Sequence, residues 1–297
     1  MVHLEILNKL VASLKLFISV DMEGIGGVIN YEHTCEKGME HEHARRLMTG
    51  EVNAAIETAL EMGATEVVVS DSHYAIPNQN IIIEELNPAA YLINGTPRPL
   101  SQLQGVDESF DAAFLMGYHA REGTRYAIMP HSYHGKVVRE LNVNGVVVGE
   151  TGINTYVLGD YGVPVILVSG DAEAVKEAEQ LVPNVETAVV KWPIGAYSAK
   201  SLHPTKAREI IREAVKMAIT KKDQIKPVKL KGPVTVEVKL KSTGMADVAE
   251  LIPTVERIDG VTVRFVSDNM VRAYRTFQAV VLISSEDLQK DEVFQRQ

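Results

Sequence analysis

Two acidic side chains follow the first strongly apolar segment of the sequence. Residues 16–20 form an apolar run that is typical of a buried strand, and Asp21 and Glu23 come directly after it. Because side chains alternate along an extended chain, both carboxylates are expected to point to the same side. The glycines at 24, 26 and 27 permit a sharp turn and leave room for a bound group. Crowded carboxylates repel each other unless a proton or a cation lies between them, so the segment predicts a cation site or, alternatively, an acidic turn.

Three further side chains with metal-binding groups follow later apolar segments. His73 follows a predicted strand at 66–70, His119 follows another at 112–116, and Glu150 ends one arm of a predicted hairpin. In open α/β sheets ligands bind outside the carboxyl ends of the strands, so these groups are expected to gather on one rim. Three carboxylates with two imidazoles suit zinc, and also manganese, cobalt or iron. Taken singly, His73 could instead cap the next segment, and His119 could be a hydrogen-bonded core residue.

A pair of ions would account for the acidic crowding, because a carboxylate at Asp21 could be shared between them. Two ions about 4 Å apart can stabilise both the attacking and the leaving oxygen in hydrolysis. A histidine beside such a pair can move protons or stabilise a developing oxyanion. His131, in a loop after Pro130, is the candidate for that role, and His134 in the same loop is the alternative. The other histidines considered, at 33, 41, 43 and 203, are expected at the surface.

Strands and helices alternate along the first two thirds of the chain. Apolar residues recur at helical spacing over 40–62, strands are predicted at 66–70, 112–116 and 164–168, and a short helix at 81–86. Asn144-Gly145 predicts a tight hairpin over 137–148. This order predicts an α/β fold with a mainly parallel sheet flanked by helices, and a smaller α+β C-terminal unit. We expect residues 1–193 to form the α/β metal-binding catalytic domain and residues 194–297 the smaller α+β domain.

The composition argues against several classes of protein. The 297 residues are 45% hydrophobic and 23% charged, as in ordinary globular proteins. A net charge of −9 argues against a nucleic-acid or anionic-membrane surface. No stretch reaches the ~20 apolar residues that a membrane span needs, and residues 1–16 are expected to form a short helical extension rather than a signal peptide. Cys35 is the single cysteine, so no intrachain disulfide can form, which fits a cytoplasmic location.

Five short motifs contain all of these candidate residues. They are Ser-Val-Asp-Met-Glu-Gly at 19–24, Asp-Ser-His at 71–73, Gly-Tyr-His-Ala at 117–120, His-Ser at 131–132 and Val-Gly-Glu at 148–150. In this order they resemble the DppA-type D-aminopeptidase family of metallopeptidases, from about residue 15 to the last predicted helix. The resemblance implies a dinuclear zinc site, with two Zn²⁺ per subunit, and the following ligands: Asp21, Glu23, His73, His119 and Glu150. It also implies that Asp21 bridges the ions and that His131 is the catalytic histidine.

The resemblance further implies an assembly and a reaction. The assembly is a ring-like homo-oligomer, a decamer of two pentameric rings with the sites facing an internal cavity. The reaction is removal of the amino-terminal residue, L or D, from short peptides, with the two ions binding the free amine and the scissile carbonyl and activating a water. An amidase or a phosphoesterase with the same ions is an alternative, although the five motifs hold no basic residue for a phosphate. A non-catalytic peptide-binding protein with a structural metal is the alternative outside enzymes.

Overall fold

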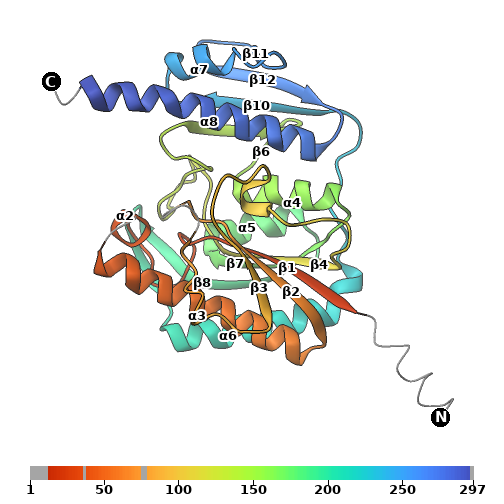
Figure 1. Cartoon of the computed structure of the whole chain (residues 1–297). Helices are drawn as coiled ribbons and strands as arrows, with labels where there is room; N and C mark the ends of the chain where they lie inside the picture. Colours follow the sequence, from red (N-terminus) through yellow and green to blue (C-terminus); the bar gives the residue numbers. More distant parts are fainter. Residues whose placement is uncertain (1–12, 36–37, 75–78, 295–297) are drawn as a thin grey trace.

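Two β-sheets organise the chain (Figure 1). The computed structural model describes residues 13–35, 38–74 and 79–294, with side chains up to residue 285. The seven-stranded sheet contains, in spatial order, β3 (Ala90–Ile93), β2 (Ala64–Asp71), β1 (Leu14–Val20), β4 (Ala112–Tyr118), β7 (Val165–Asp171), β8 (Glu186–Gly195) and β9 (Ser198–Ser201). Its neighbouring strands are parallel except for the last pair, β8 and β9. The five-stranded sheet is antiparallel and contains β11 (Glu256–Arg257), β12 (Thr262–Ser267), β10 (Val234–Leu240), β5 (Val138–Val143) and β6 (Val146–Val147).

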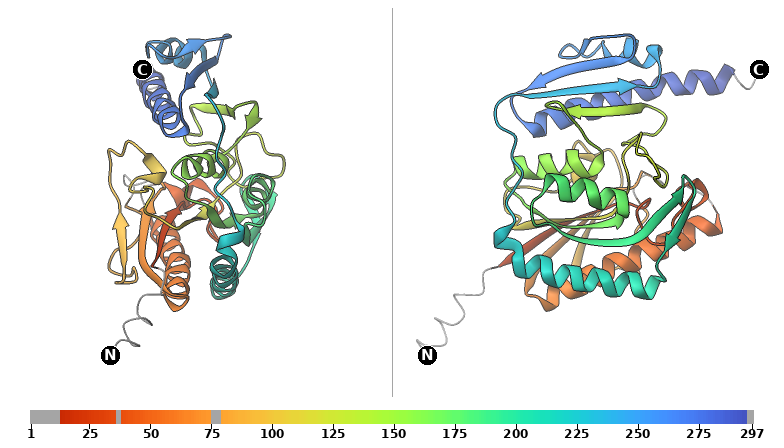
Figure 2. Two further views of the ribbon diagram at one scale, coloured as in Figure 1. Left: turned by 90° about the vertical axis from the view of Figure 1, so that its right-hand side faces the viewer. Right: turned by 180° about the vertical axis from the view of Figure 1, so that it is seen from behind.

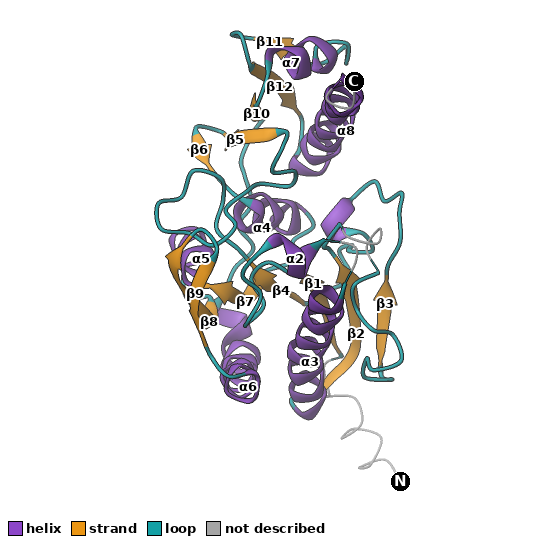
Figure 3. Cartoon of the chain, turned by 90° about the vertical axis from the view of Figure 1, so that its left-hand side faces the viewer, coloured by secondary structure: helices purple, strands orange, loops and turns teal. Residues whose placement is uncertain are grey.

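Helices cover both faces of the seven-stranded sheet. On one face α3 (Met39–Glu61) and α6 (Pro204–Lys221) lie side by side (Figure 3). On the other face pack α4 (Glu150–Asp160), α5 (Ala172–Leu181) and the short 3₁₀ turn η1 (Ser101–Leu103). The second sheet, with α7 (Thr243–Ala249) and α8 (Met270–Phe294), lies beyond α4 (Figure 2). Two short helices, α2 (Tyr31–Thr34) and η2 (Lys222–Gln224), complete the chain, and the expected α/β class is therefore confirmed.

The strand order changes direction at β1. The chain passes from β1 through α3 to β2 on one side, and later returns to place β4 on the other side of β1. The carboxyl ends of β1 and β4 therefore border the point where the connections diverge. In open α/β sheets this is the place where a crevice for ligands opens.

Sheet membership does not follow the expected division of the chain at residue 193. The hairpin at β5 and β6 lies before that residue but pairs with β10 in the second sheet. In the other direction, β9 and α6 lie after it but pack with the seven-stranded sheet. The physical reason is that strand pairing is decided by long-range contacts, which local patterns do not encode.

Local expectations can be compared element by element. The hairpin prediction is confirmed, because Asn144 and Gly145 both have the positive φ of a type I′ turn between β5 and β6. The helix expected at 81–86 is wrong: hydrogen-bonded turns occupy that segment. Residues 14–16 belong to β1, and the rest of the expected extension, before residue 13, lies outside the described residues. In the described part of the chain, no helix is long and apolar enough to cross a membrane.

Candidate metal centre

Three adjacent parallel strands deliver four of the candidate side chains to one edge of the sheet. Asp21 is the first residue after β1 and Glu23 lies two residues further on. His73 follows β2 by two residues, and His119 comes directly after β4. All four are buried: Asp21 is 3% exposed and His119 is 1% exposed. Ionisable groups are rarely buried this deeply unless they are paired or bind a metal.

Glu150 reaches the same place from a helix. The sequence predicted it at the end of a hairpin arm, but β6 ends at Val147 and Glu150 is the first residue of α4. Its carboxylate is 2% exposed and lies 3.3 Å from the imidazole of His119, between Oε1 and Nε2. The amino end of a helix carries a partial positive charge, which favours a carboxylate there.

Asp21 lies between two groups of possible ligands. On one side, Nδ1 of His73 lies 3.3 Å from Oδ1 of Asp21 and 2.9 Å from Oε2 of Glu23. On the other side, Nε2 of His119 lies 3.5 Å from the second Asp21 oxygen, Oδ2. Each group offers three atoms close enough to hold one ion: Asp21, Glu23 and His73 in the first, and Asp21, His119 and Glu150 in the second.

Backbone carbonyls fix the orientation of each imidazole. Nε2 of His73 lies 2.9 Å from the Thr34 carbonyl oxygen, and Nδ1 of His119 lies 2.9 Å from the Ala120 carbonyl oxygen. A carbonyl can only accept, so each of these nitrogens carries the proton. The other nitrogen of each ring, which faces the carboxylates, is thereby left as a lone-pair donor. Metal-binding histidines are oriented by such outer hydrogen bonds.

The donor set fits a metal better than it fits the protein alone. Among the described residues, the buried Nε2 of His119 has no hydrogen-bond partner. Burial opposes a charge on His73 and His119, but the carboxylates around them hold the pKa of both imidazoles well above the usual range. Burial likewise opposes ionisation of Glu23, yet His73 and its neighbours hold the pKa of that carboxyl well below its usual range. The site therefore demands positive charge, which a divalent ion would supply.

His131 lies beside this cluster. Its ring stacks on that of His119, with centroids 4.1 Å apart and planes 11° from parallel. Nδ1 lies 2.9 Å from the Met129 carbonyl, so Nε2 faces inward, 3.9 Å from Oε1 of Glu23 and 3.8 Å from Oε1 of Glu150. These distances are longer than those of the other two histidines, as expected of a histidine beside an ion pair. Glu23, His119 and His131 do form a third group that could hold an ion.

The loop that carries His131 is held in a strained conformation. Tyr126, Met129 and Tyr133 all have positive φ, a region that costs residues other than glycine of order 1 kcal/mol or more. Hydrogen bonds hold the loop there, including one of 2.9 Å from the Met129 amide to the Ala196 carbonyl. His134 turns away from the cluster, since its Nδ1 accepts from the Lys136 amide at 3.3 Å. The geometry thus favours His131 over His134 as the catalytic candidate.

Glycines allow the β1 and β4 ends to approach each other. The Asp21 amide donates to the Met116 carbonyl at 2.8 Å, and the Gly24 amide donates to the Gly117 carbonyl at 2.7 Å. A Cβ on Gly24 would lie 2.0 Å from the Tyr118 carbonyl oxygen, and one on Gly117 would lie 2.0 Å from the Asp21 carbonyl oxygen. Only glycine fits at either position, so the spacing of Asp21 from the strand end depends on both.

The sequence did not indicate the role of Lys191. This β8 side chain is fully buried, and its Nζ donates to the backbone carbonyls of Glu23 and Val28. Burial lowers the pKa of Lys191 to about 8, although the nearby carboxylates of Asp171 and Glu51 oppose the shift. Lys191 therefore pins both ends of the acidic loop. Its position in an alternating strand pattern gives no sign of this.

We expect Lys191→Met to destabilise the fold by roughly 3–5 kcal/mol, the usual cost of removing one partner from a buried charge network. The two carbonyls lose their donor, and the buried carboxylate of Glu51 loses a neighbouring cation. Urea unfolding at fixed protein concentration would show a lower midpoint with an unchanged slope. Lys239→Met, on an exposed position of β10, is the control. Equal midpoints for both variants would contradict the assigned role.

Other histidines differ in part from expectation. His41 is 1% exposed and its Nδ1 lies 2.8 Å from the His33 carbonyl, and His33 is also buried, so the expectation of surface positions for these two is wrong. His203 caps α6 by accepting from the Thr205 amide. The helix amino ends on which His33 and His41 lie pack against the body of the protein, which local polarity does not reveal.

The fold and the cluster define an α/β protein with a candidate metal centre at the switch point of its parallel sheet. The chain belongs to the D-aminopeptidase family of peptidases, M55, whose model matches residues 14–279. It is 40% identical over 263 residues to the D-aminopeptidase of Bacillus subtilis (strain 168), covering 88% of this chain and 94% of that protein. The solved structure of Zn-dependent D-aminopeptidase DppA from Bacillus subtilis, a self-compartmentalizing protease, matches with a TM-score of 0.88 at 38% identity, covering 91% of this chain and 98% of that one. The expected family and the expectation of a peptidase are thus confirmed, whereas the individual ligands stay predictions.

Proposed function

We propose that this protein is a zinc-dependent D-aminopeptidase that removes the amino-terminal residue of short peptides at a dinuclear site. The observation that carries the proposal is the pair of ligand groups that share Asp21, one completed by Glu23 and His73 and the other by His119 and Glu150. Support for zinc comes from the donor chemistry, since mixed imidazole and carboxylate ligands suit that ion. The Zn-dependent structural relative supports the same choice.

Each protein group has a task in this proposal. Bound zinc supplies Lewis-acid polarisation of the scissile carbonyl and lowers the pKa of water at an open position. Asp21, with one oxygen toward each histidine, holds the two positions together. His131 directs Nε2 into the centre, where it can give a proton to the leaving amine or stabilise an oxyanion. The remaining carboxylates supply the negative charge that retains two divalent ions.

The direct test is an assay with matched L- and D-aminoacyl substrates. Protein freed of metal by chelation is expected to be inactive, and added zinc is expected to restore cleavage, with the D-substrate preferred. Cleavage of a phosphoester but not of any peptide would instead support the phosphoesterase alternative. Membership of a peptidase family disfavours that alternative, and likewise the amidase and the non-catalytic peptide-binding protein.

The proposal extends to assembly and location. The self-compartmentalizing structural relative supports a ring-like decamer of two pentameric rings for this chain as well. Light scattering would then give a mass ten times that of the 32.6 kDa chain. A monomer at micromolar concentration would contradict the assembly but not the metal site. A cytoplasmic location, expected from the single cysteine, stays a prediction.

Zinc binding is expected to release protons and to weaken as pH falls. Without metal, the carboxylates hold the pKa of His73 and His119 well above the usual range, so both imidazoles are protonated at neutral pH. Zinc requires the neutral ring, and each bound histidine must therefore lose a proton. Calorimetric titration in buffers of different ionisation heat would measure about two protons released at pH 7. Release of none, with affinity independent of pH, would show that these imidazoles are not ligands.

A further inference from the structure

Both oxygens of Glu150 are held by donors from segments distant in the sequence. The Gln102 side-chain amide, on η1, donates to Oε2. The Tyr133 backbone amide, in the loop of His131, donates to Oε1 at 2.6 Å. Gln102 is 5% exposed, so no bulk water competes for this carboxylate. Two well-placed donors leave Glu150 one defined orientation toward His119.

A chain of hydrogen bonds extends from Gln102 away from the metal centre. Oε1 of Gln102 accepts from Nδ2 of Asn154, on α4, at 2.5 Å. Oδ1 of Asn154 in turn lies 2.6 Å from the Tyr133 hydroxyl, which lies 2.8 Å from the Tyr274 hydroxyl on α8. An amide oxygen can only accept, so the Tyr133 hydroxyl donates to Asn154 and accepts from Tyr274. Each step therefore has one direction, and the series ends in a donor aimed at an ionised Glu150.

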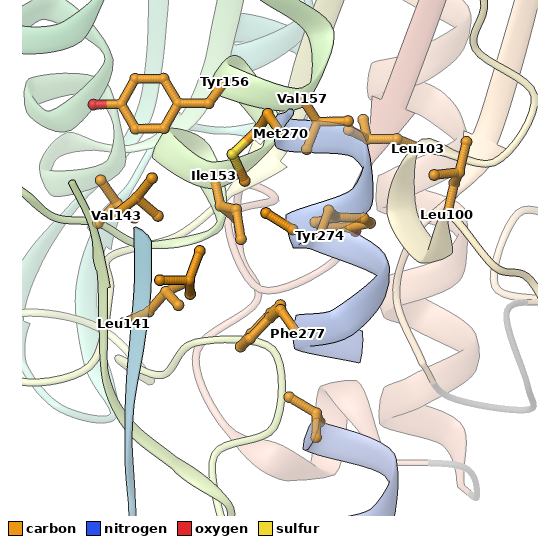
Figure 4. Close-up of a cluster of buried hydrophobic side chains, with 14 of the residues drawn as sticks. Leu100, Leu103, Leu141, Val143, Ile153, Tyr156, Val157, Met270, Tyr274 and Phe277 are labelled. Atoms are coloured by element: carbon orange, nitrogen blue, oxygen red, sulfur yellow. The ribbon is translucent and has the colours of Figure 1, made fainter. Parts of the chain in front are cut away.

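Tyr274 is the point where the two arms meet. Its hydroxyl contacts Tyr133, which bears one donor to Glu150, and the backbone of Gln102, which bears the other. Tyr274 is fully buried, and Figure 4 shows it between η1 and α4, close to Leu103 and Ile153. Helix α8 otherwise packs on the second sheet, so this residue links that sheet to the centre.

We propose that Tyr274 is a positioning residue for Glu150, which fixes through the Tyr133 and Gln102 arms the carboxylate that holds one of the two ions. The inference rests on the proposed dinuclear site and deepens it. Outer hydrogen bonds to ligating carboxylates commonly change metal affinity by 10–100-fold. The second sheet therefore does more than enlarge the core, because α8 adjusts the site from about 120 residues further along the chain than Glu150.

Zinc titration of metal-free protein against a competing chelator tests the assignment. In Tyr274→Phe, the affinity for one of the two ions is expected to fall by roughly 10-fold, while the affinity for the other stays within about twofold. Tyr156→Phe removes another hydroxyl from a buried tyrosine, on α4, and should leave both affinities unchanged. A purely structural role for Tyr274 would weaken both ions together or neither.

Gln102→Met provides a second variant that acts next to Glu150 without touching α8. It should weaken the same ion, and adding Tyr274→Phe should cost little more, because the main path to Glu150 is already broken. Unchanged affinities in Tyr274→Phe, or losses that add fully in the double variant, would overturn the inference. If the wild-type protein itself bound a single ion, the dinuclear proposal would fail, while the selective effect of Tyr274 on that ion could still be measured.

Discussion

Replacing Asp21 by alanine is expected to abolish activity and to reduce bound zinc well below two ions per chain. Asp21 is the one residue shared by both groups of possible ligands, with one oxygen toward His73 and the other toward His119. Its loss removes a ligand from both ions and leaves four ligands for two divalent charges. Elemental analysis of the purified variant, alongside its rate on the best peptide substrate, measures both effects.

The control for this variant removes a carboxylate at the opposite edge of the same sheet. Asp111 precedes β4 and is exposed, so Asp111→Ala should keep two ions and the wild-type rate. Asp21→Ala protein that kept its full zinc content would sink the assignment of Asp21 as a bridge. Loss of metal in both variants would point to general unfolding instead.

His131→Ala is expected to lower kcat by roughly 10²–10⁴, the range for a positioned acid–base group, with little change in KM. Its imidazole lies 3.8–3.9 Å from the Glu23 and Glu150 carboxylates, further than those of His73 and His119 from theirs. The ions should therefore remain bound while the proton transfer or oxyanion contact is lost. Steady-state kinetics together with zinc content separate these effects.

His134→Ala is the matched control, because it changes the second histidine of the same loop. Its side chain caps the following turn rather than facing the cluster, so its rate should fall far less. If zinc leaves with His131, that residue is a ligand, in line with the third group that it forms with Glu23 and His119. If the rate survives at His131 but collapses at His134, the roles are reversed.

The sequence predicted the strand-end part of the site because two simple rules place it. Alternation puts Asp21 and Glu23 on one side, and parallel pairing of β1, β2 and β4 brings them to the same edge as His73 and His119. The hairpin at 138–147 was recognised from its turn residues. Its partner strand β10 was not, since that strand lies about 90 residues later and no local pattern encodes the pairing.

The supporting polar residues could not be predicted for a related reason. Lys191 reads as an ordinary residue of an alternating strand, and Gln102, Asn154 and Tyr274 lie in segments with no metal-binding pattern. Their importance arises from which other segments fold against them: the acidic loop on Lys191, and α8 on η1 and α4. Local patterns thus located the metal-binding groups, whereas the residues that orient them became visible only in three dimensions.

Anomalous X-ray diffraction from zinc-loaded crystals, recorded above and below the zinc absorption edge, tests the central claim most directly. The account predicts two zinc peaks per chain, roughly 3.5–4 Å apart, as in other two-metal sites. One should lie among Asp21, Glu23 and His73, and the other among Asp21, His119 and Glu150. A single peak, or two peaks that do not share Asp21, would contradict it.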